Sequence, residues 1–63
     1  MAERDLKDLK VLLVEDVEDT RLFMRLELER QGFIVFEAAD GRSAVHTAAS
    51  ERPDIILMDL TLP

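Results

Sequence analysis

Short runs of aliphatic and aromatic residues alternate along this chain with longer segments in which apolar and polar positions are mixed. Residues 11–14 form a continuous aliphatic run that ends at two acids, and residues 55–58 repeat this character before a single acid. Such runs are too short for a helix and are typical of parallel strands buried on both faces. Residues 33–36 are aromatic and β-branched and run toward a turn signal at 39–41, so they predict a further strand.

The segments between these runs favour helices. Residues 17–31 are good helix formers without glycine or proline, and Gly32 follows as a residue that adopts the left-handed conformation at little cost. Residues 43–52 carry alanine and valine at helical spacing, and Pro53 ends that helix. Strands and helices therefore alternate with short connections, which predicts one α/β unit with a parallel sheet and its helices on one face or on opposite faces. Residues 1–10 mix charges with few apolar positions and are interpreted as a charged leader.

Composition narrows the possible partners. The chain has 63 residues, 14 acidic against 8 basic, with a net charge of −6 and no cysteine. An acidic chain without a basic cluster is a poor partner for nucleic acid or an anionic membrane surface. Its apolar runs are too short for a membrane span or a secretory signal, so we expect a cytoplasmic protein. At this length the fold is marginally stable unless oligomerisation or a partner adds buried area.

Three carboxylates follow the strands and form the candidate site. Glu15 and Asp16 come directly after the first strand, and Asp59 comes directly after the third. Ligands bind at this carboxyl end in open α/β sheets, and the three acids converge there if the first and third strands are neighbours. Crowded carboxylates repel one another unless a cation neutralises them, and oxygen ligands without histidine or cysteine favour Mg²⁺. One carboxylate, for which Asp59 is the candidate, then acts as a nucleophile toward phosphorus.

An alternative stays open for the first two acids. Glu15 and Asp16 precede a predicted helix, and acids in this position often cap a helix N-terminus instead of binding a ligand. Asp59 differs, because it follows four apolar residues and begins no helix that this sequence contains. A magnesium-dependent phosphohydrolase is a weaker interpretation, since that chemistry usually needs a second aspartate at position 61, which is threonine here.

Four sequence motifs resemble the receiver domain of two-component response regulators. They are Val-Leu-Leu-Val-Glu-Asp at 11–16, Gly-Phe at 32–33, Ala-Ala-Asp-Gly at 38–41 and Arg-Pro-Asp-Ile-Ile-Leu-Met-Asp-Leu-Thr-Leu-Pro at 52–63. The resemblance implies a truncated flavodoxin-like doubly wound fold, a three-stranded parallel sheet with strand order 2-1-3, formed by the N-terminal half of a receiver domain at 11–63.

The resemblance also assigns roles to single residues. Asp59 looks like the phosphoacceptor, which takes its phosphoryl group from a histidine kinase or a phosphotransfer protein. Asp16 is similar to a direct Mg²⁺ ligand beside Asp59, Glu15 to the acid that holds a metal-bound water, and Thr61 to the residue whose backbone carbonyl binds the ion. The positions that correspond to the kinase-facing side of the first helix are Val17, Glu18, Arg21 and Arg25.

The sequence departs from the family in its number of strands. Receiver domains have five strands, and this sequence supplies three, so the hydroxyl, aromatic and lysine residues of the later strands are absent and the active site is incomplete. We therefore expect no enzyme activity beyond the domain's own phosphoryl transfer. An unpaired apolar strand recruits another strand, which predicts a homo-oligomer, most simply a dimer. The alternative function is thus a phosphorylation-incompetent interaction module whose edge is formed by Ile55, Ile56, Leu57 and Met58.

Overall fold

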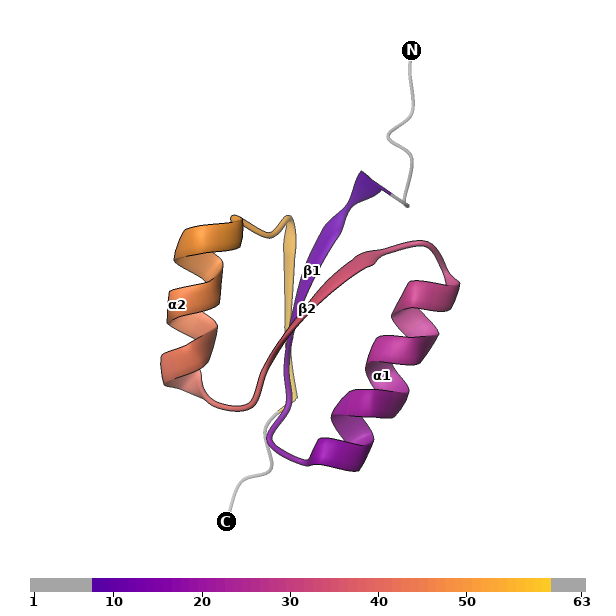
Figure 1. The fold of residues 1–63 in the computed structure, drawn as a ribbon, viewed down its shortest axis with the longest axis horizontal. Coiled ribbons are helices and arrows are strands. Elements are labelled where there is room, and N and C mark those ends of the chain that lie inside the picture. The colour runs from indigo at the N-terminus through magenta and orange to yellow at the C-terminus, as the bar shows by residue number, and fades with distance from the viewer. Residues whose placement is uncertain (1–7, 60–63) are drawn as a thin grey trace.

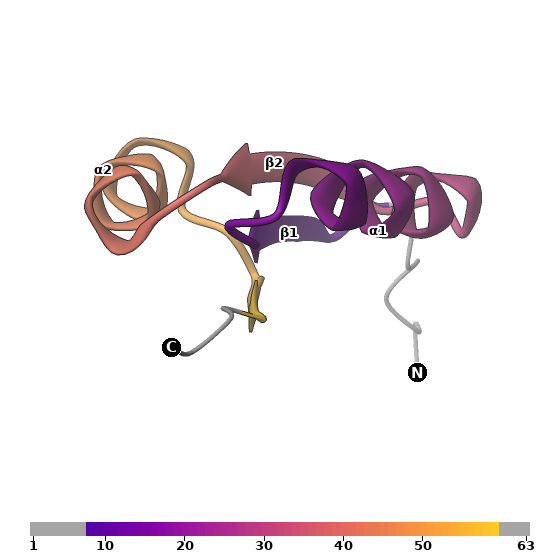
Figure 2. The same ribbon diagram turned by 90° about the horizontal axis from the view of Figure 1, so that it is seen from below.

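A computed structural model describes residues 8–59 and shows a parallel three-stranded sheet between two helices. The strand order is β2-β1-β3, and α1 and α2 lie on opposite faces of the sheet (Figures 1 and 2). This arrangement confirms the predicted α/β fold and the 2-1-3 order. In chain order the elements are β1 (Lys10–Val14), α1 (Glu18–Arg30), β2 (Ile34–Ala38), α2 (Gly41–Glu51) and β3 (Ile55–Met58).

The central strand β1 is buried on both faces, as its sequence predicts. Residues Val11 to Val14 are at most 1% exposed, and β1 pairs with β2 on one side and with β3 on the other. On the α2 side, Leu12 and Val14 pack with Ala38 and Ala44 into the hydrophobic core. Alternation along a strand places Val11 and Leu13 on the opposite face, toward α1. Burial of this one strand therefore holds both layers of the fold together.

The remaining boundaries differ from the sequence predictions by one or two residues. β1 begins at Lys10, inside the predicted leader, because Lys10 pairs with Ile34 of β2. Its backbone N–H also donates to the Asp54 carboxylate at 2.8 Å, and its ammonium donates to the Glu51 carbonyl at 3.0 Å. β2 begins one residue late and extends to Ala38, since its last two residues pair with Leu13 and Val14. β3 has the predicted limits, and Gly32 has the expected left-handed conformation, with a φ of 104°.

The predicted turn at 39–41 is a bend at Ala39 and Asp40 that leads directly into α2 at Gly41. The Asp40 carboxylate accepts a hydrogen bond from the Ser43 backbone N–H at 2.8 Å and thereby caps the helix. The Ser43 hydroxyl also donates to the Asp40 carboxylate, and the hydrogen bonds from the Ser43 backbone and hydroxyl hold the pKa of the Asp40 carboxyl below its ordinary value. An aspartate beside a glycine serves both roles here, since Asp40 ends the bend and caps the helix that follows.

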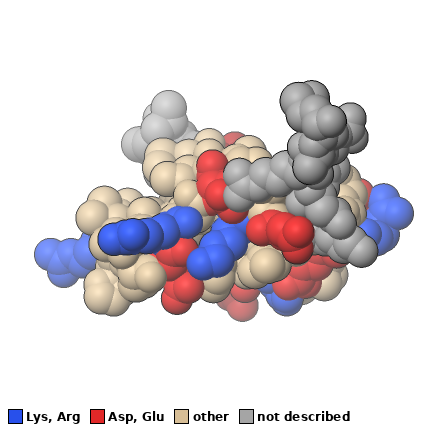
Figure 3. Space-filling view, turned by 90° about the horizontal axis from the view of Figure 1, so that it is seen from above, with Lys and Arg blue, Asp and Glu red and all other residues tan. Residues whose placement is uncertain are grey.

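Helix α1 is only partly buried against the sheet. None of its residues is buried, and Leu22, Phe23 and Leu26 are exposed, Phe23 to 71%. Met24 and Leu28 are half-buried between the helix and the sheet. On the face shown in Figure 3, acidic and basic side chains are interspersed. No helix among residues 8–59 is long and apolar enough to cross a membrane.

The burial of β1 makes a matched pair of substitutions informative. Val11→Ala removes methyl groups from a fully packed site, so we expect the free energy of unfolding to fall by about 2 kcal/mol. Val45→Ala makes the same change on α2, where the side chain is 72% exposed, and is expected to be neutral or slightly stabilising. Urea denaturation followed by circular dichroism measures both. Equal losses in the two variants would contradict this assignment of the core.

The Asp40 cap predicts a pH dependence of stability. A folded-state pKa below the ordinary value of 3.8 means that the cap's contribution is fully present above that value and is lost as the pH falls through the lower folded-state pKa. Asp40→Asn keeps an oxygen acceptor but does not titrate. The difference in unfolding midpoint between the original protein and Asp40→Asn should therefore shrink between pH 5 and pH 2, roughly the window in which a carboxylate titrates. A pH-independent difference would exclude an ionised cap.

Candidate functional site

The strand register brings the predicted acids to one edge of the sheet. Val14 is the last residue of β1 and pairs with Ala38 of β2 and Met58 of β3. The Glu15 backbone N–H donates to the Ala38 carbonyl at 3.0 Å, and the Asp59 backbone N–H donates to the Val14 carbonyl at 2.9 Å. Asp59 is therefore fixed beside the segment that carries the other acids.

The three acids have different surroundings. Glu15 is 2% exposed, and its carboxylate accepts a hydrogen bond from the Val17 backbone N–H at 2.9 Å. Asp16 and Asp59 are exposed. A buried carboxylate that already accepts a backbone N–H is held in place, whereas exposed carboxylates at the end of a sheet are accessible to a ligand.

The capping alternative for the acid pair is wrong, because neither Glu15 nor Asp16 caps α1. The N-cap of α1 is Val17, and no side chain caps the helix. Glu15 instead bonds the N–H of the N-cap residue itself, so it shapes the turn that leads into the helix. The acids in the first turn of α1 are Glu18 and Asp19, where the helix dipole favours negative charge.

An arginine of α1 joins the acid segment to β2. The Arg21 guanidinium donates to the Glu15 carbonyl at 2.9 Å, and its Nε donates to the Glu37 carboxylate at 3.3 Å. Arg25 Nε lies 3.1 Å from the other Glu37 oxygen without hydrogen-bond geometry, so that contact is an ion pair only. Arg25 also donates to Glu29 at 3.1 Å. Two arginines thus flank one carboxylate between the helix and the sheet.

The four positions predicted to face a kinase differ in how exposed their side chains are. Val17 and Glu18 are exposed, as a docking surface requires. The side chains of Arg21 and Arg25 are only 20% and 30% exposed and pair with Glu37 of β2. Glu37 was not predicted as their partner. A single acid in an otherwise apolar strand is a signal that could have identified it.

The donor set fits a hard divalent cation. Its side chains offer oxygen only, and Mg²⁺ commonly takes one or two carboxylates while keeping several waters. Within the described ranges, no group of three or more histidine, cysteine, aspartate or glutamate residues is arranged to hold a metal. Glu15, Asp16 and Asp59 therefore lie at one end of the sheet but do not form such a group of three; Asp16 and Asp59 alone match the one or two carboxylates that Mg²⁺ commonly takes. Thr61, predicted to give a backbone carbonyl, lies outside the described residues.

The fold and its acidic edge together define a class of protein, the open α/β domains that bind ligands at the carboxyl ends of their parallel strands. Within that class, the family model of the response regulator receiver domain matches residues 11–63. The chain belongs to this family, whose members act in two-component signal transduction and interact with histidine kinases or phosphotransfer proteins.

Curated relatives agree with this assignment. The chain is 41% identical over 54 residues to the alkaline phosphatase synthesis transcriptional regulatory protein PhoP of Bacillus subtilis, covering 86% of this chain and 22% of that protein. It is 45% identical over 53 residues to the KDP operon transcriptional regulatory protein KdpE of Escherichia coli, covering 84% and 24%.

A third relative is shorter. Sporulation initiation phosphotransferase F of Bacillus subtilis is 33% identical over 54 residues, covering 86% of this chain and 44% of that protein. The chain thus spans less than half the length of each of these three relatives. No solved structure matches it.

Proposed function

We propose that this chain is the phosphoryl-accepting part of a two-component receiver, with Asp59 as the phosphoacceptor. The observation that supports this most directly is the hydrogen bond from the Asp59 backbone N–H to the Val14 carbonyl, which sets Asp59 beside the Glu15–Asp16 pair. The exposure of Asp59 is consistent with attack on a group carried by another protein.

The chemistry is a transfer of phosphoryl from nitrogen to oxygen. A carboxylate oxygen of Asp59 attacks the phosphorus of a phosphohistidine on the kinase or phosphotransfer protein. The new O–P bond forms as the P–N bond breaks, and the departing imidazole keeps the bonding electron pair and takes a proton. The product is an aspartyl phosphate on this chain, and positioning and charge stabilisation are the main contributions that a protein makes to such a step.

Asp16 and Asp59 would hold Mg²⁺ directly, Glu15 through a water, and Thr61 through its backbone carbonyl. When bound, the ion neutralises negative charge between the carboxylates and the incoming phosphoryl group. The buried Glu15 carboxylate keeps the turn into α1 in shape through Val17. Val17 and Glu18, both exposed at the start of α1, are proposed as part of the kinase-facing surface.

Phosphorylation of Asp59 can be tested by intact mass. Incubation with a small-molecule phosphodonor and Mg²⁺ should add one phosphoryl group, and Asp59→Asn should abolish the adduct because an amide is not a nucleophile here. Asp54→Asn is the matched control, since Asp54 flanks the same strand at its other end, where it bonds Lys10. An adduct that persists in Asp59→Asn would contradict the assignment. An unmodified original protein would contradict the proposed function.

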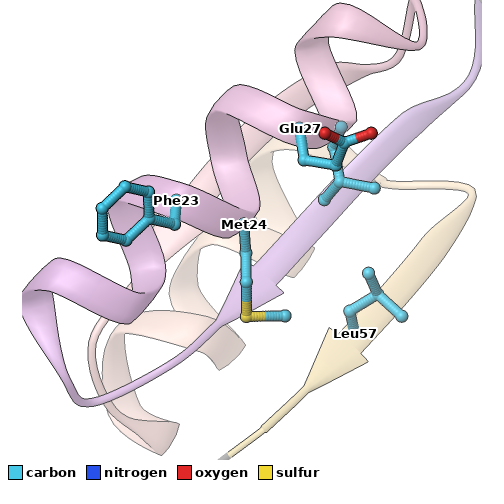
Figure 4. A pocket seen from close by; sticks show the side chains of 5 residues that line it. Phe23, Met24, Glu27 and Leu57 are labelled. Carbon is cyan, nitrogen blue, oxygen red and sulfur yellow. The ribbon is translucent and has the colours of Figure 1, made fainter.

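A second proposed function rests on the exposed edge of β3. Its four residues are all apolar, between 36% and 61% exposed, and none carries the charge or proline that protects an edge strand. Apolar hollows border β3 on both faces of the sheet, one lined by Leu57 and α1 residues, the other by Ile56, Met58 and α2 residues. Figure 4 shows Met24 and Leu57 reaching into the first of these.

We infer that a second copy of this chain covers that edge. A two-fold axis perpendicular to the sheet pairs the edge of β3 with the edge of its own copy in antiparallel orientation. The corresponding faces of the two strands then lie on the same side of the joined sheet. Because both faces of β3 are apolar, such a pairing buries matched surfaces. The net charge of −6 opposes association, so salt should strengthen it.

Analytical ultracentrifugation tests this association. We expect a concentration-dependent dimer at micromolar protein that Leu57→Lys converts to monomer, because the substitution places a charge in the apolar interface. Leu22→Lys is the control, since Leu22 is 41% exposed against 36% for Leu57 but lies on α1 outside both hollows, and this variant should stay dimeric. A monomer in the original protein at these concentrations would contradict association through β3.

A further inference from the structure

Arg21 contacts three separate segments of the molecule. Its backbone belongs to α1, where its N–H donates to the Val17 carbonyl at 2.8 Å. Its side chain donates to the Glu15 carbonyl in the segment after β1 and to Glu37 on β2. With 20% of its side chain exposed, Arg21 is largely enclosed by these partners.

The segment that leads from β1 to α1 is short and is held by several hydrogen bonds. The Glu15 backbone N–H is bound by the Ala38 carbonyl, and the Val17 N–H by the Glu15 carboxylate. The Glu15 carbonyl in turn accepts a hydrogen bond from the Arg21 guanidinium. A charged donor makes a stronger hydrogen bond than a neutral one, so this contact contributes strongly to the orientation of the peptide between Glu15 and Asp16.

Arg25 provides an internal comparison. It is one turn further along α1 and shares the Glu37 carboxylate with Arg21. Its other partner is Glu29 on the same helix, and among residues 8–59 Arg25 has no hydrogen bond to the turn between β1 and α1 like that of Arg21. Both arginines therefore attach α1 to β2, but only Arg21 also holds the acid segment.

We propose that Arg21 is a positioning residue for Asp16. By bonding the Glu15 carbonyl while Glu37 fixes its own guanidinium, Arg21 sets the direction in which the Asp16 carboxylate leaves the sheet. The metal-binding part of this inference rests on the proposed function. The orientation of the turn does not depend on it.

Two measurements on matched variants separate positioning from simple attachment of α1. Arg21→Gln should speed hydrogen exchange of the Val17 amide relative to amides of β1, and it should weaken binding of Mn²⁺, used as a probe for Mg²⁺, by about tenfold. Arg25→Gln removes the parallel contact with Glu37 and should leave both values within about twofold of the original. Arg21→Lys keeps the positive charge but lacks the planar fork that reaches two partners, so it should restore little of the affinity.

The outcomes are distinguishable. Equal effects of Arg21→Gln and Arg25→Gln would show that both arginines only attach the helix, and full rescue by Arg21→Lys would show that charge alone matters; either result overturns the proposal. If the original protein bound no Mn²⁺, the proposed metal site would fail, and the exchange of the Val17 amide would still decide whether Arg21 positions the turn.

Discussion

The pairing of β1 with a strand on each side is the constraint on which the rest of this structure depends. Because β1 is hydrogen-bonded to β2 and to β3, its last residues become the place where both neighbouring strands end. The Val14 carbonyl accepts the N–H of Asp59, and the Glu15 N–H donates to Ala38. Four fully buried aliphatic side chains stabilise this pairing. The same hydrophobic burial that folds the chain therefore assembles its acidic edge.

The two faces of the sheet are covered in different ways. Toward α2 the contact is an apolar core, whereas toward α1 the buried Val11 and Leu13 are joined by two arginines around Glu37. Partly exposed ion pairs each contribute only about 0–1 kcal/mol, so the apolar side chains supply most of the stability on both faces. The arginines add direction to the α1 contact, because a guanidinium bonds its partners in a fixed geometry. The acid segment leads directly into α1, where Arg21 bonds both that segment and the sheet.

The sequence predicted the parts of the fold that hydrophobic runs define. The run at 55–58 coincides with β3, and the left-handed Gly32 follows α1 as expected. The run at 33–36 did not reveal that β2 continues through Glu37, because strand pairing with β1 sets that limit. Arg21 and Arg25 were assigned to an exposed surface by family resemblance. Their orientation depends on a partner carboxylate sixteen and twelve residues away, which local sequence patterns do not encode.

The acidic edge divides into a structural and an accessible part, and β3 links the accessible part to association. Glu15 is buried and bonded within the turn, while Asp16 and Asp59 reach the surface. Asp59 directly follows the edge strand, so any strand that pairs with β3 also restricts the backbone that carries it. Strand pairing that orders the backbone of Met58 also orders the backbone of Asp59, the next residue. The proposed phosphoryl acceptance at Asp59 and the proposed coverage of the β3 edge would therefore be coupled, because one short strand takes part in both.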